Sequence, residues 1–351
     1  MVPLSKAMAV YQLTLPARVD TPASLRIARE LIDHSDADAI MLDFGNVSWV
    51  EPFGMLYISM TIQSVRVRFP RLRVFAQKYH DQGYAIHMGF LQHCGISVGN
   101  RWRSTPGSET YSPITEIKLS ELEARAFSNK TVVQDEIEAA AQKLAALLIR
   151  DPTETNLIDV VQYSIRELGR NIAEHSSSPS LLYCAQFWPT KQRIEVCIAD
   201  CGVGLLETLK ENPHLTIETD ADAIKAAILP GISGKPISRK ASYEDPWANS
   251  GFGLFMLSRL CARGGNFFLA SGNNGLLISE GSEHLVEAGC QGTAVRMVMN
   301  TKEVGGLSES LQRIAAEGSA VAKEITGSET VGPSRASSMV RRVFHIKSPD
   351  E

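Results

Sequence analysis

Strand-like and helix-like runs alternate along the first hundred residues of the chain. The strand-like runs alternate apolar with polar residues, and the helix-like runs repeat apolar residues at spacings of three and four. We expect strands at 10–15, 40–44 and 72–75 and helices at 21–34, 55–69 and 81–90, with Thr21 capping the first helix. Strands must pair laterally and helices must bury an apolar face, so this alternation requires a sheet covered by helices. The sequence therefore predicts a small α/β domain over residues 1–100.

A polar segment rich in Gly, Pro and Ser predicts a linker at residues 101–113. A larger domain is expected at 114–300, and a C-terminal helix and tail at 301–351. In the larger domain we expect helices at 132–149, 156–175, 221–229 and 253–262, and strands at 181–187, 194–199, 267–270, 276–278 and 294–299. The expected fold class of the whole chain is α/β (α+β).

The composition limits what this chain of 351 residues does. With 44% hydrophobic and 21% charged residues it is not a mainly disordered chain. A formal net charge of -4 argues against a broad nucleic-acid surface, and no apolar run approaches the roughly 18 residues that a membrane span needs. The six cysteines form no CxxC pair, and the N-terminus has no signal-peptide pattern. We expect a cytoplasmic protein with reduced thiols, and neither nucleic acid nor membrane as a partner.

The first candidate site residues lie on the expected helix at 156–175. Glu167, Asn171 and His175 are spaced by four, so they follow one stripe of the helix beside an apolar stripe. One face of the helix can then pack while the next presents a carboxylate, an amide and an imidazole. The pattern alone also fits a solvated polar face, with His175 placed at the helix C-terminus because a cation is favoured there.

Three glycine-containing segments follow the helix in sequence. Asp200 ends an expected strand and precedes Gly202 and Gly204, which allow close approach of backbone to a ligand. Gly251 and Gly253 open the expected helix at 253–262, where free N–H groups favour phosphate. Each segment alone also fits an ordinary turn. The chain contains neither a P-loop motif nor a Rossmann fingerprint.

The combination, in this order, resembles the ATP-binding boxes of the GHKL superfamily, which includes gyrase, the heat-shock chaperone, histidine kinases and MutL. RELGRNIAEHS resembles the N box, IADCGVGL the first glycine box, NSGFGLFML the second, and QGTAVRMVM the closing Gly-Thr strand. The resemblance covers about residues 113–300, half of the chain. It implies a GHKL or Bergerat two-layer α/β sandwich that binds ATP and Mg²⁺.

The resemblance also implies roles for individual residues. Asp200 would accept a hydrogen bond from the adenine amino group, and Asn171 would hold Mg²⁺ through its amide oxygen. Glu167 would orient or deprotonate the attacking water or hydroxyl, as the catalytic residue. The residues implied to bind ATP are Asn171, Asp200, Gly202, Gly204, Lys235, Gly251, Gly253, Leu254 and Thr293.

Residues 231–250, between the two glycine boxes, would form a lid over the nucleotide. Lys235 lies in this glycine-flanked segment, where its charge would close on the γ-phosphate. A solvated loop lysine is the equal alternative, and Arg239 and Lys240 are weaker candidates for the same role.

The N-terminal domain resembles the STAS fold of anti-sigma-factor antagonists through IMLDFGNVSWVEPFGMLYI. The usual Asp-Ser-Ser-Gly turn is replaced by Glu51–Gly54, so the phosphoacceptor serine is missing, and neither Ser48 nor Ser59 fills its position. We expect this loop to be an exposed docking surface for an unknown protein partner, with Trp49 and Phe53 as anchors. The alternative is that both aromatic residues belong to the core.

Three functions are compatible with these motifs. The favoured hypothesis is a slow Mg²⁺-dependent ATPase that acts as a conformational switch and passes its state to a partner through the STAS-like domain. The alternatives are a serine kinase that acts on a separate STAS protein, and a nucleotide-sensing scaffold with little turnover. Histidine autokinase activity is disfavoured because residues 119–174 contain no histidine. The resemblance also allows a homodimer formed on ATP binding.

Overall fold

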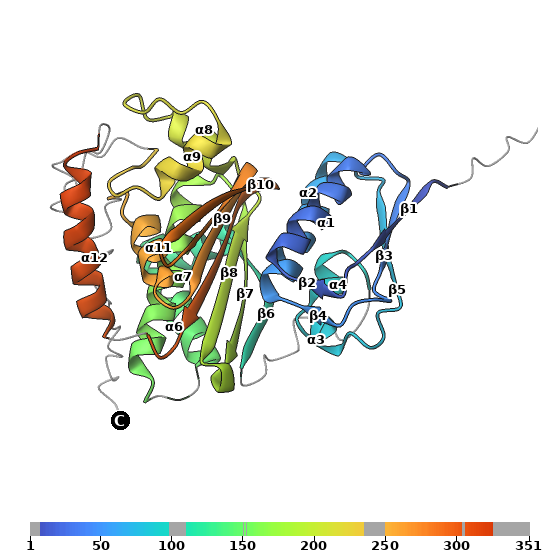
Figure 1. Cartoon of the computed structure of the whole chain (residues 1–351), viewed down its shortest axis with the longest axis horizontal. Helices are drawn as coiled ribbons and strands as arrows, with labels where there is room; N and C mark the ends of the chain where they lie inside the picture. Colours follow the sequence, from blue (N-terminus) through green and yellow to red (C-terminus); the bar gives the residue numbers. More distant parts are fainter. Residues whose placement is uncertain are drawn as a thin grey trace, which may run out of the picture.

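The computed structural model describes residues 8–97, 110–149, 151, 153–234, 250–303 and 306–325. Helices and strands are mixed in the described residues, so the fold class is α/β (α+β), as predicted. Figure 1 shows a large sheet near the middle of the molecule, with helices against one face and the N-terminal region, residues 8–97, against the other. We call this large sheet the central sheet.

The N-terminal region contains a parallel three-stranded sheet in the order β1-β3-β5. Its strands are β1 (Val10–Thr14), β3 (Ala39–Asp43) and β5 (Arg73–Gln77), with a separate parallel pair β2 (Arg18–Val19) and β4 (Trp49–Val50). Its helices are α1 (Thr21–Asp33), α2 (Pro52–Arg68), α3 (Gly83–His87) and α4 (Phe90–His93). The predicted alternation is confirmed, although the last predicted helix is divided into α3 and α4 and the short pair was not foreseen.

The cap of α1 differs from the prediction by one residue. Asp20 is the N-cap, and its side chain accepts a hydrogen bond from the Ala23 N–H at 3.0 Å. Thr21 is instead the first helical residue, with Pro22 in the first turn. Both residues are capable caps, and a carboxylate at this position also interacts favourably with the positive end of the helix dipole.

The central sheet is five-stranded and antiparallel, in the order β6-β7-β8-β10-β9. Its strands are β6 (Tyr111–Lys118), β7 (Ser180–Trp188), β8 (Arg193–Asp200), β9 (Asn266–Ser279) and β10 (Ser282–Asn300). The helices of this part are α5 (Leu119–Asn129), α6 (Val133–Leu148), α7 (Thr155–His175), α8 (Gly204–Lys210), α9 (Asp220–Ala227), α11 (Gly253–Ala262) and α12 (Leu307–Ala322). Predicted and observed helices agree closely for α6, α7, α9 and α11.

Three predictions about this part are wrong in detail. Strand β6 begins at Tyr111, inside the predicted linker, and α5 and α8 were not predicted. The three short strands expected after residue 266 form one long hairpin, which turns at Gly281 with φ of 70°. The polar stretches between the apolar runs stay extended because backbone hydrogen bonds between β9 and β10 hold them without apolar side chains.

The two faces of the central sheet pack against different partners. On β8, Ile194, Val196 and Ile198 belong to the core shared with α7, whereas Cys197 and Ala199 belong to the core shared with the N-terminal region. Successive side chains of a strand point to opposite faces, which explains this division. Strand β8 is therefore buried along almost its whole length, because both of its faces are covered.

Helix α2 is buried on nearly all sides. Every residue from 52 to 62 is buried, and Figure 1 shows α2 between the three-stranded sheet and the central sheet. Its apolar residues share one core with Leu182, Cys184 and Phe268 of the central sheet. The sequence predicted a single apolar face for this helix, but the buried surface extends around all sides of the helix over residues 52–62. A helix that lies between two sheets needs apolar residues on all sides.

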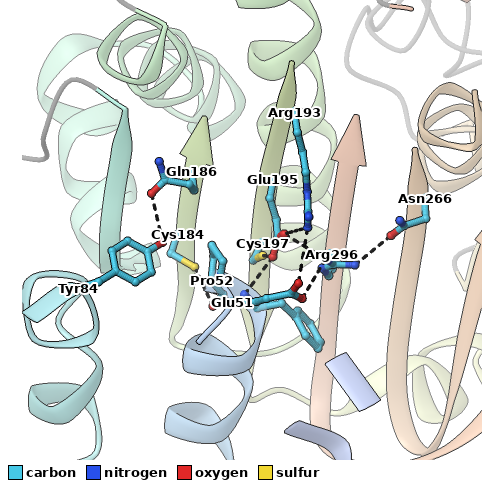
Figure 2. Close-up of polar contacts among 11 residues, drawn as sticks. Glu51, Pro52, Tyr84, Cys184, Gln186, Arg193, Glu195, Cys197, Asn266 and Arg296 are labelled. Atoms are coloured by element: carbon cyan, nitrogen blue, oxygen red, sulfur yellow. Dashed lines mark hydrogen bonds and ion pairs between the residues drawn. The ribbon is translucent and has the colours of Figure 1, made fainter. Parts of the chain in front are cut away.

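Buried charged side chains also join α2 to the central sheet (Figure 2). Arg296 on β10 contacts both Glu51, the N-cap of α2, and Glu195 on β8, each at 3.1 Å. Glu195 further accepts a hydrogen bond from Arg193 at 2.7 Å and one from the backbone N–H of Phe53 at 3.2 Å. Burial is the main cause that raises the pKa of Glu51, against the opposing effect of Arg296. These contacts fix the start of α2 on the sheet.

The predicted exposed docking surface at residues 49–54 is therefore wrong. Phe53 is fully buried, and its ring packs edge-on against Phe268 with centroids 5.4 Å apart. Trp49 is half-buried and stacks on Tyr84. The segment expected to be a loop consists of β4, the N-cap Glu51 and the first turn of α2, and the start of α2 already packs against the chain's own central sheet. Ser59 is also fully buried within α2.

None of the helices in the described parts of the chain combines the length and the apolar character needed to cross a bilayer. All six cysteines are free thiols, as expected, and five of them are buried.

Candidate functional site

Helix α7 carries the first predicted site residues on a face that the apolar stripe does not use. Leu168 and Ile172 pack toward the central sheet, while Glu167, Asn171 and His175 line a pocket at the C-terminal half of the helix. The solvated polar face that the sequence also allowed is excluded for Glu167, which is only 3% exposed. The helix periodicity thus brings these three side chains to one pocket.

The carboxylate of Glu167 is held by arginine. Arg166 donates to Glu167 Oε1 from Nη2 at 3.0 Å and from Nε at 3.2 Å, and Arg170 Nη1 lies 3.8 Å from the same oxygen. The other oxygen, Oε2, lies on the side of α11, where a Cβ on Gly253 would come within 3.0 Å of it. The two oxygens of Glu167 therefore have different surroundings.

Asp200 ends strand β8 on the face that carries α7. Its Oδ1 accepts a hydrogen bond from the Gly202 N–H at 2.8 Å, and the backbone of Thr293, its partner on β10, also hydrogen-bonds the carboxylate. Burial raises the pKa of Asp200 to about 6, although both backbone hydrogen bonds oppose the rise. Within the described residues no Lys or Arg side chain forms an ion pair with it. This buried carboxylate can accept a further hydrogen bond from a group in the pocket.

The glycines after Asp200 are required by close backbone contacts. A Cβ on Gly202 would lie 1.9 Å from the carbonyl oxygen of Ser176, which also accepts the Val203 N–H at 2.8 Å. Gly204 has φ of 79° and lines the pocket, whereas Gly202 packs on the end of α7. Side chains at these two positions would separate β8 from α7 or distort the loop.

The second glycine segment brings α11 to the pocket. Gly251 has φ of 69°, and a Cβ there would lie 2.6 Å from the Ile232 carbonyl oxygen. A Cβ on Gly253 would contact Glu167 and Asn171, so this glycine keeps the space between α11 and α7 open. Among the described residues no side chain caps the N-terminus of α11. Its N–H groups and the positive end of its dipole favour an anion beside Asn171.

The structure brings most of the predicted site residues into one pocket. The pocket is lined by Glu167, Asn171, His175, Asp200, Gly204, Gly251, Gly253, Leu254 and Thr293, together with neighbouring residues. These residues come from four segments that are far apart in the sequence. Lys235, Arg239 and Lys240 lie outside the described residues, and so does most of the predicted lid.

The side-chain oxygens of the pocket could hold Mg²⁺ only together with oxygens from a bound ligand. Within the part of the chain that the structure describes, no group of three or more His, Cys, Asp and Glu side chains is arranged to hold a metal. Asn171 and Glu167 do offer hard oxygen donors next to the N-terminus of α11. Mg²⁺ is typically held by one or two such oxygens plus substrate phosphates, and this site fits that description.

Sequence reasoning missed several residues that build the pocket. Arg166 and Arg170 are almost completely buried beside Glu167, and Ser271 accepts the Leu205 N–H at 2.9 Å while donating to the Gly292 carbonyl at 2.8 Å. Ile198 lines the pocket two residues before Asp200. Ile198 could have been found from the sequence, because alternate residues of a strand point to the same face and Ile198 is two residues before Asp200. The burial of Arg166 and Arg170 could not, because an arginine on a polar helix face looks the same in the sequence whether it is buried or exposed.

Comparison with known proteins adds no relative to this description. No protein-family model, no curated protein and no solved structure matches the chain.

Proposed function

We propose that the chain binds ATP with Mg²⁺ in the pocket between α7, α11 and β8, as a protein of the GHKL type. One observation carries the proposal: the predicted N-box residues, the strand-end Asp200, the glycines before α11 and Thr293 all line the same pocket. They come from segments separated by up to about 120 residues, so their convergence does not follow from their local patterns.

Each end of the pocket suits a different part of the nucleotide. At one end, Asp200 offers a buried acceptor, and Ile198 and Val295 offer apolar side chains for adenine. At the other end, the N-terminus of α11, which no side chain of the described residues caps, and the amide of Asn171 suit phosphates. Bound Mg²⁺ would neutralise phosphate charge, held by the amide oxygen of Asn171 together with phosphate oxygens.

We further propose that turnover is slow hydrolysis that changes the state of the N-terminal region. Asp200 is followed by Cys201, whose sulfur accepts a hydrogen bond from Ser64 of α2 at 3.5 Å. A change at Asp200 on nucleotide binding would therefore act on the residue directly before one that contacts α2. This direct route supports a switch more than a scaffold that only holds nucleotide.

Titration calorimetry with Mg²⁺-ATP tests the binding proposal. Asp200→Asn replaces the carboxylate with a neutral amide and should lower ATP affinity about 10- to 100-fold, because the charge assistance of a hydrogen bond worth about 1.5–3 kcal/mol is lost. Asp43→Asn is the matched control, since Asp43 also ends a strand and accepts the N–H of a glycine two residues on, Gly45 at 2.9 Å. Equal affinities for wild type and Asp200→Asn would exclude the assignment.

Incubation with γ-labelled ATP then separates the three functions. Release of free phosphate by the protein alone supports the switch. Label transferred to a second protein in lysate supports the serine kinase, and binding without either product supports the scaffold. Label on Ser59 is not expected, because that hydroxyl is buried and donates to the Leu56 carbonyl at 3.0 Å.

A further inference from the structure

A buried set of polar side chains contacts Glu167 through Arg166. Glu138 on α6 is 2% exposed, and Arg166 on α7 is 1% exposed. Arg166 Nη1 donates to Glu138 Oε2 at 3.2 Å, and Gln162 donates to Glu138 Oε1. Both oxygens of Glu138 are thus engaged, and Arg166 connects them to Glu167. We call Gln162, Glu138 and Arg166 the positioning trio.

The geometry of the trio selects one oxygen of Glu167. Arg166 directs two N–H groups, Nε and Nη2, at the same oxygen, Oε1. A guanidinium that donates twice in its own plane fixes the rotation of a carboxylate more firmly than a single contact does. With Oε1 held in this way, Oε2 is the oxygen that lies toward Gly253 and the pocket.

Stability alone is a poor explanation for the trio. A buried ion pair commonly contributes less to folding than apolar side chains of the same volume, since both charges lose their hydration. Burial lowers the pKa of Arg166, but Glu167 and Glu138 outweigh it, so the guanidinium stays charged. The chain therefore maintains a full charge in the core, one residue from the predicted catalytic group.

We propose that Arg166, itself oriented by Glu138 and Gln162, is a positioning residue that aims Glu167 Oε2 at the attacking water or hydroxyl. The inference depends on the proposed ATP turnover and adds the residues that make it productive. Arg166 acts through Glu167 and need not touch nucleotide. Displacement of a reacting group by about 1 Å is enough to reduce a rate by about 100-fold, so small losses of alignment should be visible in kcat.

The test compares kcat with KM for ATP. Arg166→Lys keeps the charge but loses the planar pair of donors, and Glu138→Gln keeps the volume but loses the ionic partner of Arg166. Both variants should lower kcat about 10- to 100-fold while KM and the calorimetric affinity stay within about twofold. Glu195→Gln is the matched control, because Glu195 is equally buried and arginine-paired but lies on the other face of the sheet. It should leave kcat unchanged.

A double variant separates alignment from mere packing. If Arg166 acts only through Glu167, then Arg166→Lys should cost nothing further in the residual turnover of a Glu167→Gln background. Additive losses in the double variant, or normal kcat in Arg166→Lys, would overturn the inference while the ATP site stands. Wild-type protein that binds ATP without any turnover would overturn it as well. Failure of wild type to bind ATP would instead contradict the proposed function.

Discussion

Asp43 and Asp200 occupy the same local structure in two regions of the molecule, yet their surroundings differ. Each ends a buried strand, β3 or β8, and each accepts the N–H of a glycine two residues later, at 2.9 Å for Gly45 and 2.8 Å for Gly202. The backbone hydrogen bond to Gly45 and the Lys78 ammonium lower the pKa of Asp43. Burial raises that of Asp200 to about 6.

The comparison shows that the Asp-x-Gly pattern sets the turn and does not set its function. Asp43 is satisfied by Lys78 and Gln12 within its own region. Asp200 has only backbone donors among the described residues and opens onto the pocket. A strand-end carboxylate becomes a candidate ligand group when burial is not balanced by a cation, because the remaining hydrogen-bonding capacity then has to be met by something else.

The largest difference should appear when each glycine is replaced by alanine. A Cβ on Gly202 meets the backbone of Ser176 at 1.9 Å, whereas a Cβ on Gly45 meets the flexible end of Lys78 at 2.8 Å. We expect Gly202→Ala to lower the free energy of unfolding by about 3 kcal/mol or more, and Gly45→Ala by less than about 1 kcal/mol. Urea denaturation of both variants measures this. Similar midpoints for the two variants would show that the β8 turn is not constrained by α7.

The second difference concerns the pH dependence of stability at Asp200. The pKa of Asp200 is about 6 in the folded chain, and its ordinary value of 3.8 applies to the unfolded chain. Folding therefore favours the protonated carboxyl group. The wild type should therefore lose up to about 3 kcal/mol of stability as pH rises from about 4 to above 6, relative to Asp200→Asn. Thermal melts at pH 4.5 and pH 8 should show the variant becoming the more stable protein at the higher pH. A constant difference between the two proteins at both pH values would contradict this.

Asp43 should behave in the opposite direction. Its pKa is lowered in the folded chain, so its ionised form stabilises the fold above the ordinary pKa, and this contribution is lost as pH falls through the folded value. Asp43→Asn should therefore be less stable than wild type at pH 7, with the gap closing in acid. Melts of the two proteins across the same pH series provide the measurement, and a gap that widens in acid would refute the assignment.

The smallest effect is expected at Lys78. Its ammonium contacts Asp43 at 3.0 Å, but its side chain is 62% exposed. Lys78→Met should change the free energy of unfolding by no more than about 1 kcal/mol, because solvent and salt screen an exposed pair. Adding 0.5 M salt to the wild type should reproduce most of the change. A much larger loss would mean that Lys78 supports the turn in another way.

Much of this fold could be predicted from local patterns, and the exceptions are non-local. Helix α7 and strand β8 were predicted within a residue or so, because the period of apolar residues is strong there. The long β9–β10 hairpin was not predicted, because its middle is polar and is held by backbone hydrogen bonds between the two strands. Phe53 was misplaced for a related reason. An aromatic residue directly after the Glu51-Pro52 pair gives no sign that a second sheet will cover it.

For the site, sequence reasoning found the residues but not their supports. The spacing of four on α7 and the glycine segments made Glu167, Asn171, Asp200 and Gly253 candidates, and all four line the pocket. Each pattern alone also fitted a solvated helix face or an ordinary turn, so their order along the chain was needed to choose them. Arg166 lies next to Glu167 in the sequence and looks like any surface arginine. Only the packing of α6 against α7 places Glu138 opposite it and removes both from water.

The burial of α2 between two sheets has a practical consequence for work with fragments. A recombinant fragment that begins at Tyr111 would keep every described residue of the pocket, yet it would leave Phe268, Leu182 and Cys184 facing water. A contiguous apolar patch of that kind promotes association of the fragment with itself or with chaperones. Dissection of this protein into an N-terminal half and a C-terminal half that carries the pocket is thus expected to yield insoluble material, and functional studies need the uncut chain.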